Sequence, residues 1–410
     1  MLKTSSTRTD LVIALAGRVI STFGDEVALV ALTLRLEADG ARPYEIALLL
    51  AAGLIPLLLL SRPVGRLVDS HDSRHLLVWA GLIEVACTVP LIFIHSLVVI
   101  VILVALLGAA ASVTGTTWSA LVPRVVGEDR VAQAVSAQQS LNALALVGAP
   151  AVGGVLAGAF GSGLPLAVDA ASFVLVTLAA ALVRTRRRPD GLASSPDQPI
   201  RARGGFEILR TDRVLAPLTI GLGLVVLLVG MVDVVLVFLV RVTLHAGGVW
   251  YGVTEAAWMA GIVAGSLGAG RLRTEPLQTW ATIAGAGVAC AALAPFAVAP
   301  VVWMLAPLSI LGGVGNGYAG VCFSTLLVRR TPDAERGRVS AAANAAVGGA
   351  QGISLLVGGA LAATLSPREI YAVAGMLGVA ATIAIAVYCA ARASSGHRVD
   401  PQGAQELLRG

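Results

Sequence analysis

Long apolar runs alternate with short polar connections along this chain, and twelve such runs can be distinguished. Most are close to the roughly 20 residues that cross a bilayer, and none alternates strictly as a half-buried strand does. Because a bilayer core accepts only helices or closed barrels, each run is predicted to be a membrane-spanning helix. The predicted spans are 11–36, 44–61, 76–95, 96–119, 133–160, 163–183, 214–240, 250–270, 277–297, 300–327, 339–365 and 369–391.

The composition leads to the same class of protein. Of the 410 residues, 57% are hydrophobic and 13% are charged, whereas a soluble domain is usually about 25% charged. One soluble core stops growing at about 250–300 residues, so soluble enzymes, nucleic-acid binders and secreted disulfide scaffolds are excluded. The four cysteines lie inside apolar runs without paired spacing, so neither a disulfide nor a metal site is predicted.

The basic residues predict how the spans are oriented. With the N-terminus inside the cell, 24 basic residues fall on the inner side and four on the outer side. This asymmetry predicts a multi-pass protein of the cell membrane with both termini in the cytoplasm. The polar stretch 184–213 is interpreted as a basic cytoplasmic linker, either solvated or in contact with anionic lipid. It would separate a bundle at 1–183 from one at 214–391, with a cytoplasmic tail at 392–410.

The two halves share short sequences at an offset near half the chain length. Gly65-Arg66-Leu67 recurs as Gly270-Arg271-Leu272, and Gly153-Gly154 recurs as Gly358-Gly359. The consistent offset predicts two pseudo-symmetric six-helix bundles. Transporters built from such repeats bind their substrate near the bilayer midplane, between the halves.

Ionisable residues inside the spans are the first candidates for chemistry, because each costs about 2.5–3.5 kcal/mol at the bilayer centre. They are Arg18, Asp25, Glu26, Glu84 and Asp233. A carboxyl group in such a place can bind and release a coupling proton; alternatively, it is structural and paired with Arg18 or the backbone. Arg18 and Asp25 share one helix face, whereas Glu26 points about 100° away from Asp25.

The polar connection after the second span carries a recognisable motif. Gly65, Leu67, Asp69 and Arg74 match the Gly-x-Leu-Ala-Asp run with following basic residues that is typical of the major facilitator superfamily, so the chain resembles that family. The resemblance implies that Asp69 and Arg74 lock the cytoplasmic side of the outward-open state. An ordinary polar turn is the alternative.

A second motif lies in the fifth span. Gly148, Pro150, Gly153 and Gly154 are similar to the Gly-Pro-x-x-Gly-Gly antiporter motif of drug exporters in that family, with Ala149 in place of a glycine. Further segments resemble the branch of macrolide and siderophore exporters. Proton antiporters of the family often carry an Arg in the fourth span; this chain has none there, so Arg18 would supply the positive partner.

Polar and aromatic residues inside spans are candidates for the wall of a substrate cavity, although hydrogen bonds between helices or packing explain them equally well. They are Gln138, Gln139, Asn142, Trp258 and Asn316. The chain has no phosphate-binding Walker loop, no Ser/His dyad and no His-Glu-x-x-His run in a span, so neither an ATP-driven pump nor an enzyme is predicted. No cofactor is predicted.

These observations predict an all-α transporter, monomeric in membrane lipid, that exports an amphipathic small molecule such as an antibiotic, drug or siderophore-like metabolite. Protons would drive the export by alternating access. One alternative is a proton symporter or uniporter that imports a small metabolite. Another is a receptor or assembly subunit that binds without transporting.

Asp25→Asn is expected to abolish gradient-driven transport while leaving substrate binding or exchange, because an amide cannot carry the coupling proton. The measurement is a toxicity panel of antibiotics, dyes and siderophore analogues in an efflux-deficient bacterial host, with wild type and empty vector as controls. Undiminished uphill transport by a well-expressed variant would contradict the assignment of Asp25.

Overall fold

The computed structural model describes residues 2–126, 131–182, 204–332 and 335–395, and these ranges contain helices and no strand. The helices of the first half are α1 (Leu2–Ala38), α2 (Pro43–Leu59), α3 (Ser61–Ser70), α4 (Ser73–Leu91), α5 (Leu97–Val126), α6 (Val131–Phe160) and α7 (Gly163–Leu182). In the second half they are α8 (Gly205–Thr211), α9 (Leu215–Asp233), α10 (Leu236–Phe238), α11 (Gly248–Ala269), α12 (Glu275–Leu293), α13 (Leu305–Arg330), α14 (Arg336–Leu361) and α15 (Pro367–Ser395). A π-helical turn (Leu239–Thr243) follows α10, and two 3-10 turns (Ala294–Val298 and Val302–Met304) connect α12 to α13.

Each predicted span overlaps a helix of this structure, but the span predicted at 214–240 is interrupted after α9 and continues into α10 and the π-helical turn. Within the described residues, nine helices are long and apolar enough to cross a membrane, or ten if the bent pair α2 and α3 counts as one span. The two other predicted spans correspond to α1 and α11. Both carry ionisable residues in mid-helix, Asp25 and Glu26 in α1 and Glu255 in α11. These charges make the two helices less apolar than the other spans.

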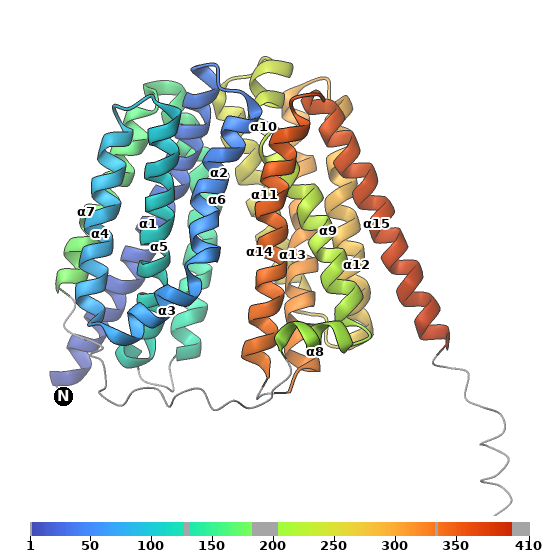
Figure 1. The fold of residues 1–410 in the computed structure, drawn as a ribbon, viewed down its shortest axis with the longest axis horizontal. Coiled ribbons are helices and arrows are strands. Elements are labelled where there is room, and N and C mark those ends of the chain that lie inside the picture. Colours follow the sequence, from blue (N-terminus) through green and yellow to red (C-terminus); the bar gives the residue numbers. More distant parts are fainter. Residues whose placement is uncertain (1, 127–130, 183–203, 333–334, 396–410) are drawn as a thin grey trace, which may run out of the picture.

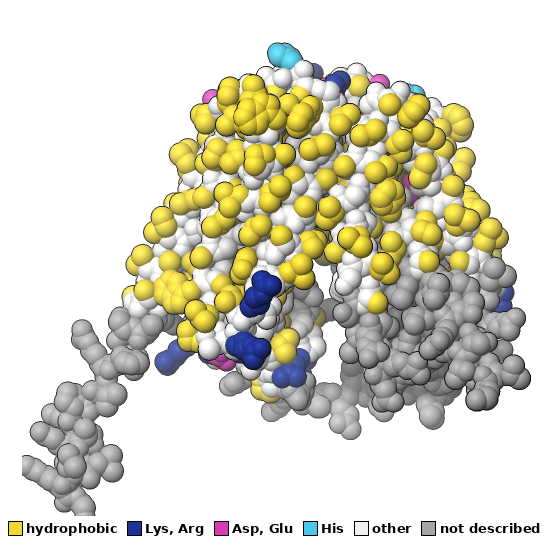
Figure 2. Space-filling model, turned by 180° about the vertical axis from the view of Figure 1, so that it is seen from behind, with side chains coloured by type: hydrophobic (Ala, Val, Ile, Leu, Met, Phe, Trp, Pro, Cys, Tyr) yellow, Lys and Arg dark blue, Asp and Glu magenta, His cyan; other side chains and the backbone are white. Residues whose placement is uncertain are grey.

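The helices form two bundles that stand side by side, α1–α7 in one and α9–α15 in the other (Figure 1). The bundles touch mainly where α6 packs against α11 and where α2 packs against α14. In the figure they lie close together at the end that carries α10, the α10 end, and farther apart at the end that carries α3 and α8, the α3 end. Hydrophobic side chains are the most frequent coloured ones on the face seen in Figure 2, as expected of a surface that meets lipid.

The paired glycines of α6 explain the first contact between the bundles. A Cβ atom added to Gly153 would lie 3.0 Å from the carbonyl oxygen of Val27 in α1, and one added to Gly154 would lie 3.2 Å from Cα of Gly252 in α11. Gly153 therefore lets α6 approach a helix of its own bundle, and Gly154 lets it approach the other bundle. Close backbone contact through small residues is the usual packing mode in membranes.

The recurring glycine pair in α14 has the same arrangement. A Cβ atom added to Gly358 would lie 2.6 Å from the carbonyl oxygen of Met231 in α9, and one added to Gly359 would lie 2.6 Å from Cβ of Ala47 in α2. The first glycine again meets the opening helix of its own bundle, and the second again meets the second spanning helix of the other. The sequence repeat thus corresponds to equivalent contacts in space.

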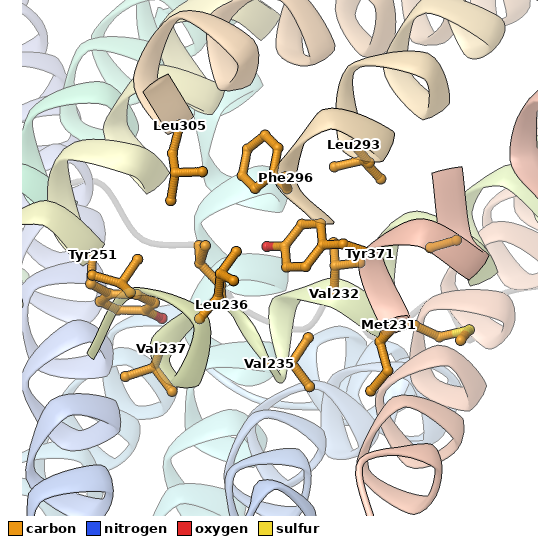
Figure 3. Close-up of a cluster of buried hydrophobic side chains, with 14 of the residues drawn as sticks. Met231, Val232, Val235, Leu236, Val237, Tyr251, Leu293, Phe296, Leu305 and Tyr371 are labelled. Atoms are coloured by element: carbon orange, nitrogen blue, oxygen red, sulfur yellow. The ribbon is translucent and has the colours of Figure 1, made fainter. Parts of the chain in front are cut away.

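One buried apolar cluster of the second bundle lies toward the α10 end, and another reaches α8 at the opposite end. The side chains of the first cluster come from α9, α10, α11, α12 and α15, and they include the stacked rings of Phe296 and Tyr371, whose centroids are 4.8 Å apart (Figure 3). Val30 and Leu34 of α1 belong to the same cluster. The apolar core therefore continues across the interface between the bundles at the α10 end.

The predicted linker 184–213 falls largely outside the described residues, including its arginines at 184–188, and so does the tail from residue 396. Its described end differs from the expected polar connection, because residues Gly205–Thr211 form helix α8. This helix packs on α14, where a Cβ atom added to Gly205 would overlap the carbonyl oxygen of Arg338. Contact with α14 thus orders a stretch whose composition alone suggests a loop.

Gly359→Ala is expected to destabilise the protein, because the new methyl group would meet Ala47 at the interface between bundles. Overpacking of this kind costs about 1–3 kcal/mol. Gly349→Ala in the same helix is the matched control, since nothing lies within 4 Å of its Cβ position, and it should be neutral or stabilising by up to about 1 kcal/mol. Thermal unfolding in one detergent compares the two; equal midpoints would contradict the close contact.

Candidate functional site

A cavity of about 430 Å³, the central cavity, lies between the two bundles. It is lined by residues of α1, α2 and α6 from one bundle and of α9–α15 from the other. The polar and aromatic lining residues are Glu26, Asp233, Tyr251, Thr254, Glu255, Trp258, Phe296, Ser309, Asn316, Gln351 and Tyr371. Because both bundles contribute to its wall, any rearrangement of one bundle against the other changes this cavity.

Three carboxyl groups face the central cavity, from Glu26, Asp233 and Glu255. Asp233 accepts a hydrogen bond from Nε2 of Gln351 at 3.2 Å between its Oδ2 and that nitrogen. Among the described residues that line the cavity, none is Lys or Arg. When these carboxyl groups are ionised, their charge must be balanced by protons or by a bound cation.

Aromatic side chains form much of the remaining wall. Trp258 packs against Gly312 of α13 so closely that a Cβ atom there would overlap its ring. Tyr251 and Tyr371 bring hydroxyl groups into an otherwise apolar cluster (Figure 3). The cavity thus combines apolar and aromatic surface with acidic groups, which suits an amphipathic ligand.

An ion pair joins the bundles at the α10 end. Nε of Arg241, in the π-helical turn, lies 3.1 Å from Oε2 of Glu37 in α1, and Arg241 also donates to the carbonyl oxygen of Ala246 at 3.2 Å. Leu34 packs against Gly248 nearby. Together with the Gly154–Gly252 contact, these interactions hold the bundles together at this end.

A second and smaller cavity of about 210 Å³, the N-bundle cavity, is lined only by residues of the first bundle. Asp25 and Asp169 face it, and Glu26 lines both cavities. Asp25 is exposed although it lies in mid-helix, which fits its position on the cavity wall. Asp25 therefore lines the N-bundle cavity, whereas its neighbour Glu26 also reaches the central cavity, in agreement with their separation of about 100° around α1.

Glu84 and Arg18 lie in the same bundle. Glu84 is buried in α4 and accepts a hydrogen bond from Oγ1 of Thr114 at 2.9 Å. The guanidinium of Arg18 lies against Gly115 of α5, 3.2 Å from its Cβ position, and is close enough to act electrostatically on Asp25 and Glu84. Although Arg18 belongs to the first span, its positive charge thus lies against the fourth.

The motif after the second span has a different local structure from the expected loop. Gly65, Leu67 and Asp69 lie in the short helix α3, which is bent by 58° from α2. The carboxylate that caps the next helix belongs to Asp72, which accepts from the backbone N–H of Arg74 at 2.8 Å. The Arg74 side chain donates to the carbonyl oxygen of Ala181 and so ties α4 to the end of α7.

The antiporter-like motif lies where three helices meet. Gly148 faces Phe23 of α1, and Pro150 lines the central cavity. The carbonyl oxygen of Pro150 lies against Gly252 of α11, where an added Cβ atom would overlap it. With Gly153 and Gly154 described above, the motif places α6 against both α1 and α11.

The predicted cavity residues divide into two groups. Trp258 and Asn316 line the central cavity, whereas Gln138, Gln139 and Asn142 of α6 are not among the residues that line either cavity. Gln139 is exposed, while Gln138 and Asn142 are half-buried. These three lie nearer the α3 end of α6 than the part of this helix that reaches the cavity.

Sequence reasoning missed several residues of these sites. Glu255 and Asp169 lie inside predicted spans, so the rule that singled out Asp25 also applies to them. Tyr251, Gln351 and Tyr371 carry no comparable signal, because only the packing of α11, α14 and α15 turns them toward the cavity.

The chain matches a known protein family over most of its length. The family model described as Major Facilitator Superfamily matches residues 14–348 and 256–408. Macrolide efflux protein A of Streptococcus pyogenes is 23% identical over 259 residues, which cover 62% of this chain and 64% of that protein. A protein of the same name from Enterococcus faecalis is 25% identical over 222 residues, covering 52% and 68%. This chain therefore matches less than two thirds of the length of the first of these relatives.

Solved structures share the fold at low sequence identity. The nucleoside transporter NupG superposes with a TM-score of 0.73 and 12% identity, covering 92% of this chain and 98% of that one. An inward-facing bacterial homologue of the iron transporter ferroportin gives a TM-score of 0.69 with 19% identity, covering 93% and 97%. These likenesses concern the arrangement of helices.

Proposed function

This chain belongs to the Major Facilitator Superfamily, and we propose that it exports positively charged amphipathic small molecules across the cell membrane in exchange for protons. It is a multi-pass membrane transporter; the direction, the substrate and the coupling ion are the proposal. The observation that carries it is the chemistry of the central cavity. Three carboxyl groups face a space that no described Lys or Arg lines.

The cavity suits a cation with an apolar body. A volume of about 430 Å³ lies within the range of roughly 300–1,000 Å³ that is usual for small-molecule sites. Trp258, Tyr251 and Phe296 offer aromatic surface, and cations bind well to aromatic faces in addition to carboxylates. Apolar parts of a ligand would contact residues such as Leu54 and Met259.

Two observations favour export. The motif of Gly148, Pro150, Gly153 and Gly154 resembles that of drug antiporters, and its glycines lie at the contacts between α6, α1 and α11. The relatives named macrolide efflux protein A make a macrolide antibiotic a suitable substrate to test.

Charge balance supplies the coupling. An uncompensated carboxylate in a membrane is costly, so the acids of the cavity must hold either the cationic substrate or protons whenever the bundles move. Release of the substrate outside would leave carboxylates that take up protons there and release them inside. One proton that moves down 100 mV yields about 2.3 kcal/mol, which favours a cycle in this direction.

Alternating access would use the contacts between the bundles. For the cavity to open at the α10 end, the ion pair of Glu37 with Arg241 and the packing of Gly154 against Gly252 must separate. The bundles would then approach each other at the α3 end, where they lie apart in Figure 1. Asp69 and Arg74 lie at that end, on α3 and at the start of α4, and the family resemblance gives them the role of a lock there.

Glu255→Gln is expected to weaken binding of tetraphenylphosphonium by about tenfold, which corresponds to about 1.4 kcal/mol, because one of three facing charges is lost. Binding is measured by titration calorimetry on the purified full-length protein, with neutral triphenylphosphine oxide as the control ligand and Glu335→Gln, outside the cavity, as the control variant.

In cells, wild type should protect an efflux-deficient host from erythromycin, and an uncoupler should remove that protection. Equal affinity of wild type for the charged and neutral ligands, together with no protection, would overturn the proposal.

A further inference from the structure

The N-bundle cavity adjoins the central cavity, with which it shares the lining residues Glu26 and Leu29. All of its lining residues belong to α1, α2, α4, α5 and α7, so it lies inside one bundle and does not depend on the contact between bundles. Apart from Glu26, its titratable lining residues are Asp25 on α1 and Asp169 on α7. Any ion or proton that binds in this cavity therefore has these two carboxyl groups as its nearest ionisable partners.

Asp169 is the less accessible of the two. It is only 3% exposed, and its Oδ1 atom accepts no hydrogen bond from any described residue. A buried oxygen of this kind usually has a partner, because leaving it unpaired costs about 1–3 kcal/mol. The nearby hydroxyl of Ser172 donates to the backbone carbonyl oxygen of Asp169 at 2.8 Å, so Oδ1 remains able to accept a hydrogen bond from another donor.

A glycine brings the two helices together at this point. A Cβ atom added to Gly24, the residue before Asp25, would lie 2.6 Å from Oδ1 of Asp169 and 2.7 Å from Oγ of Ser172. The carboxyl group of Asp169 therefore lies directly against the backbone of α1. No larger residue fits at position 24 without moving the acid.

The surrounding charges do not balance. Asp25 is close enough to Asp169, Glu84, Glu26 and Arg18 for their charges to act on it. Glu84 also acts on Asp169, and Arg18 acts on Glu84. Four carboxyl groups thus share one guanidinium within a single bundle. Neighbouring carboxylates in a medium of low dielectric constant cannot all remain ionised at acceptable cost.

We propose that Asp25 and Asp169 share a second transported proton in the N-bundle cavity, in addition to the protons that exchange with the substrate in the central cavity, and that Glu26, which lines both cavities, links the two sites. The role of this proton in transport rests on the proposed function, whereas its binding by Asp25 and Asp169 does not. One carboxyl group binds the proton and donates it in a hydrogen bond to the other carboxylate. Asp25 reaches the cavity space, so it is the group that loads and unloads the proton.

The proton fits this site better than a metal ion does. Within the described residues, no group of three or more His, Cys, Asp and Glu side chains is arranged to hold a metal. A single hydrogen bond between two carboxyl groups needs no further ligand. It would also supply the donor that Oδ1 of Asp169 lacks.

Proton binding at this pair can be measured without any substrate. Infrared difference spectra of the purified full-length protein between acidic and alkaline pH should contain a C=O stretching band of a protonated carboxyl group that is lost in both Asp25→Asn and Asp169→Asn. Asp39→Asn, which removes a carboxyl group at the α10 end, should keep it. The proposal that Asp25 and Asp169 share a proton would be overturned if the band survived in either variant. It would also be overturned if the band appeared only in sodium-free buffer, because sodium would then be the bound ion.

Transport distinguishes this inference from the proposed function. In proteoliposomes, Asp169→Asn should lose at least tenfold of tetraphenylphosphonium uptake driven by a pH gradient, yet bind the ligand within twofold of wild type, because the carboxyl groups of the central cavity remain. Absence of uptake by wild type would contradict the proposed function alone, since the infrared result stands apart. Uptake by Asp169→Asn at the wild-type rate would contradict the inference and leave the proposed function intact.

Gly24→Ala gives an independent check that keeps both acids. The added methyl group would displace Asp169 from α1, so the infrared band should shift or split while the number of carboxyl groups stays the same. Gly223→Ala is the control, since its Cβ position has open space. An unchanged band in folded Gly24→Ala protein would contradict the close pairing.

Discussion

The cost of carboxylate charge in a medium of low dielectric constant governs this structure more than any other single constraint. Ten described spans satisfy the bilayer by composition alone, counting the bent pair as one. The acids Asp25, Glu26 and Glu255 lie in the two helices outside that set, and each faces a cavity. Carboxyl groups at these places make membrane insertion more costly, but they also create sites that require a proton or a cation as partner. The proposed exchange of a cation for protons depends on such sites.

The contact between bundles is organised around the same helices. Glycines at equivalent positions of α6 and α14 let each approach one helix of its own bundle and one of the other. The position of α1 and α11 beside α6 follows from these contacts, and so does the wall of the central cavity. Packing of small residues and placement of charges are therefore two aspects of one arrangement.

The sequence predicted the helices well because their signal, a long apolar run, is local. It also identified Asp25, Glu26, Glu84 and Asp233 as unusual, because an ionisable residue in a span is rare regardless of its surroundings. It did not predict which cavity each acid faces. Asp25 and Glu26 are neighbours, and only the packing of α1 against α7 on one side and the second bundle on the other separates their environments.

The errors have equally physical causes. Glu255 and Asp169 were missed although the rule that selected Asp25 applies to them, whereas Gln138 and Gln139 were selected by polarity that faces neither cavity. The polar connection after α2 proved to contain a helix, because α3 lies against α5.

The weak apolar character of α11 also bears on how the chain is made. This helix packs most extensively against α13 and α6, and α13 is synthesised later than α11. Until α13 emerges, α11 lacks one of the two helices against which it packs most extensively. We therefore expect α11 to remain beside the insertion machinery, or against the completed first bundle, while the following helices are translated. The order of synthesis thus becomes part of how the substrate cavity acquires its charge.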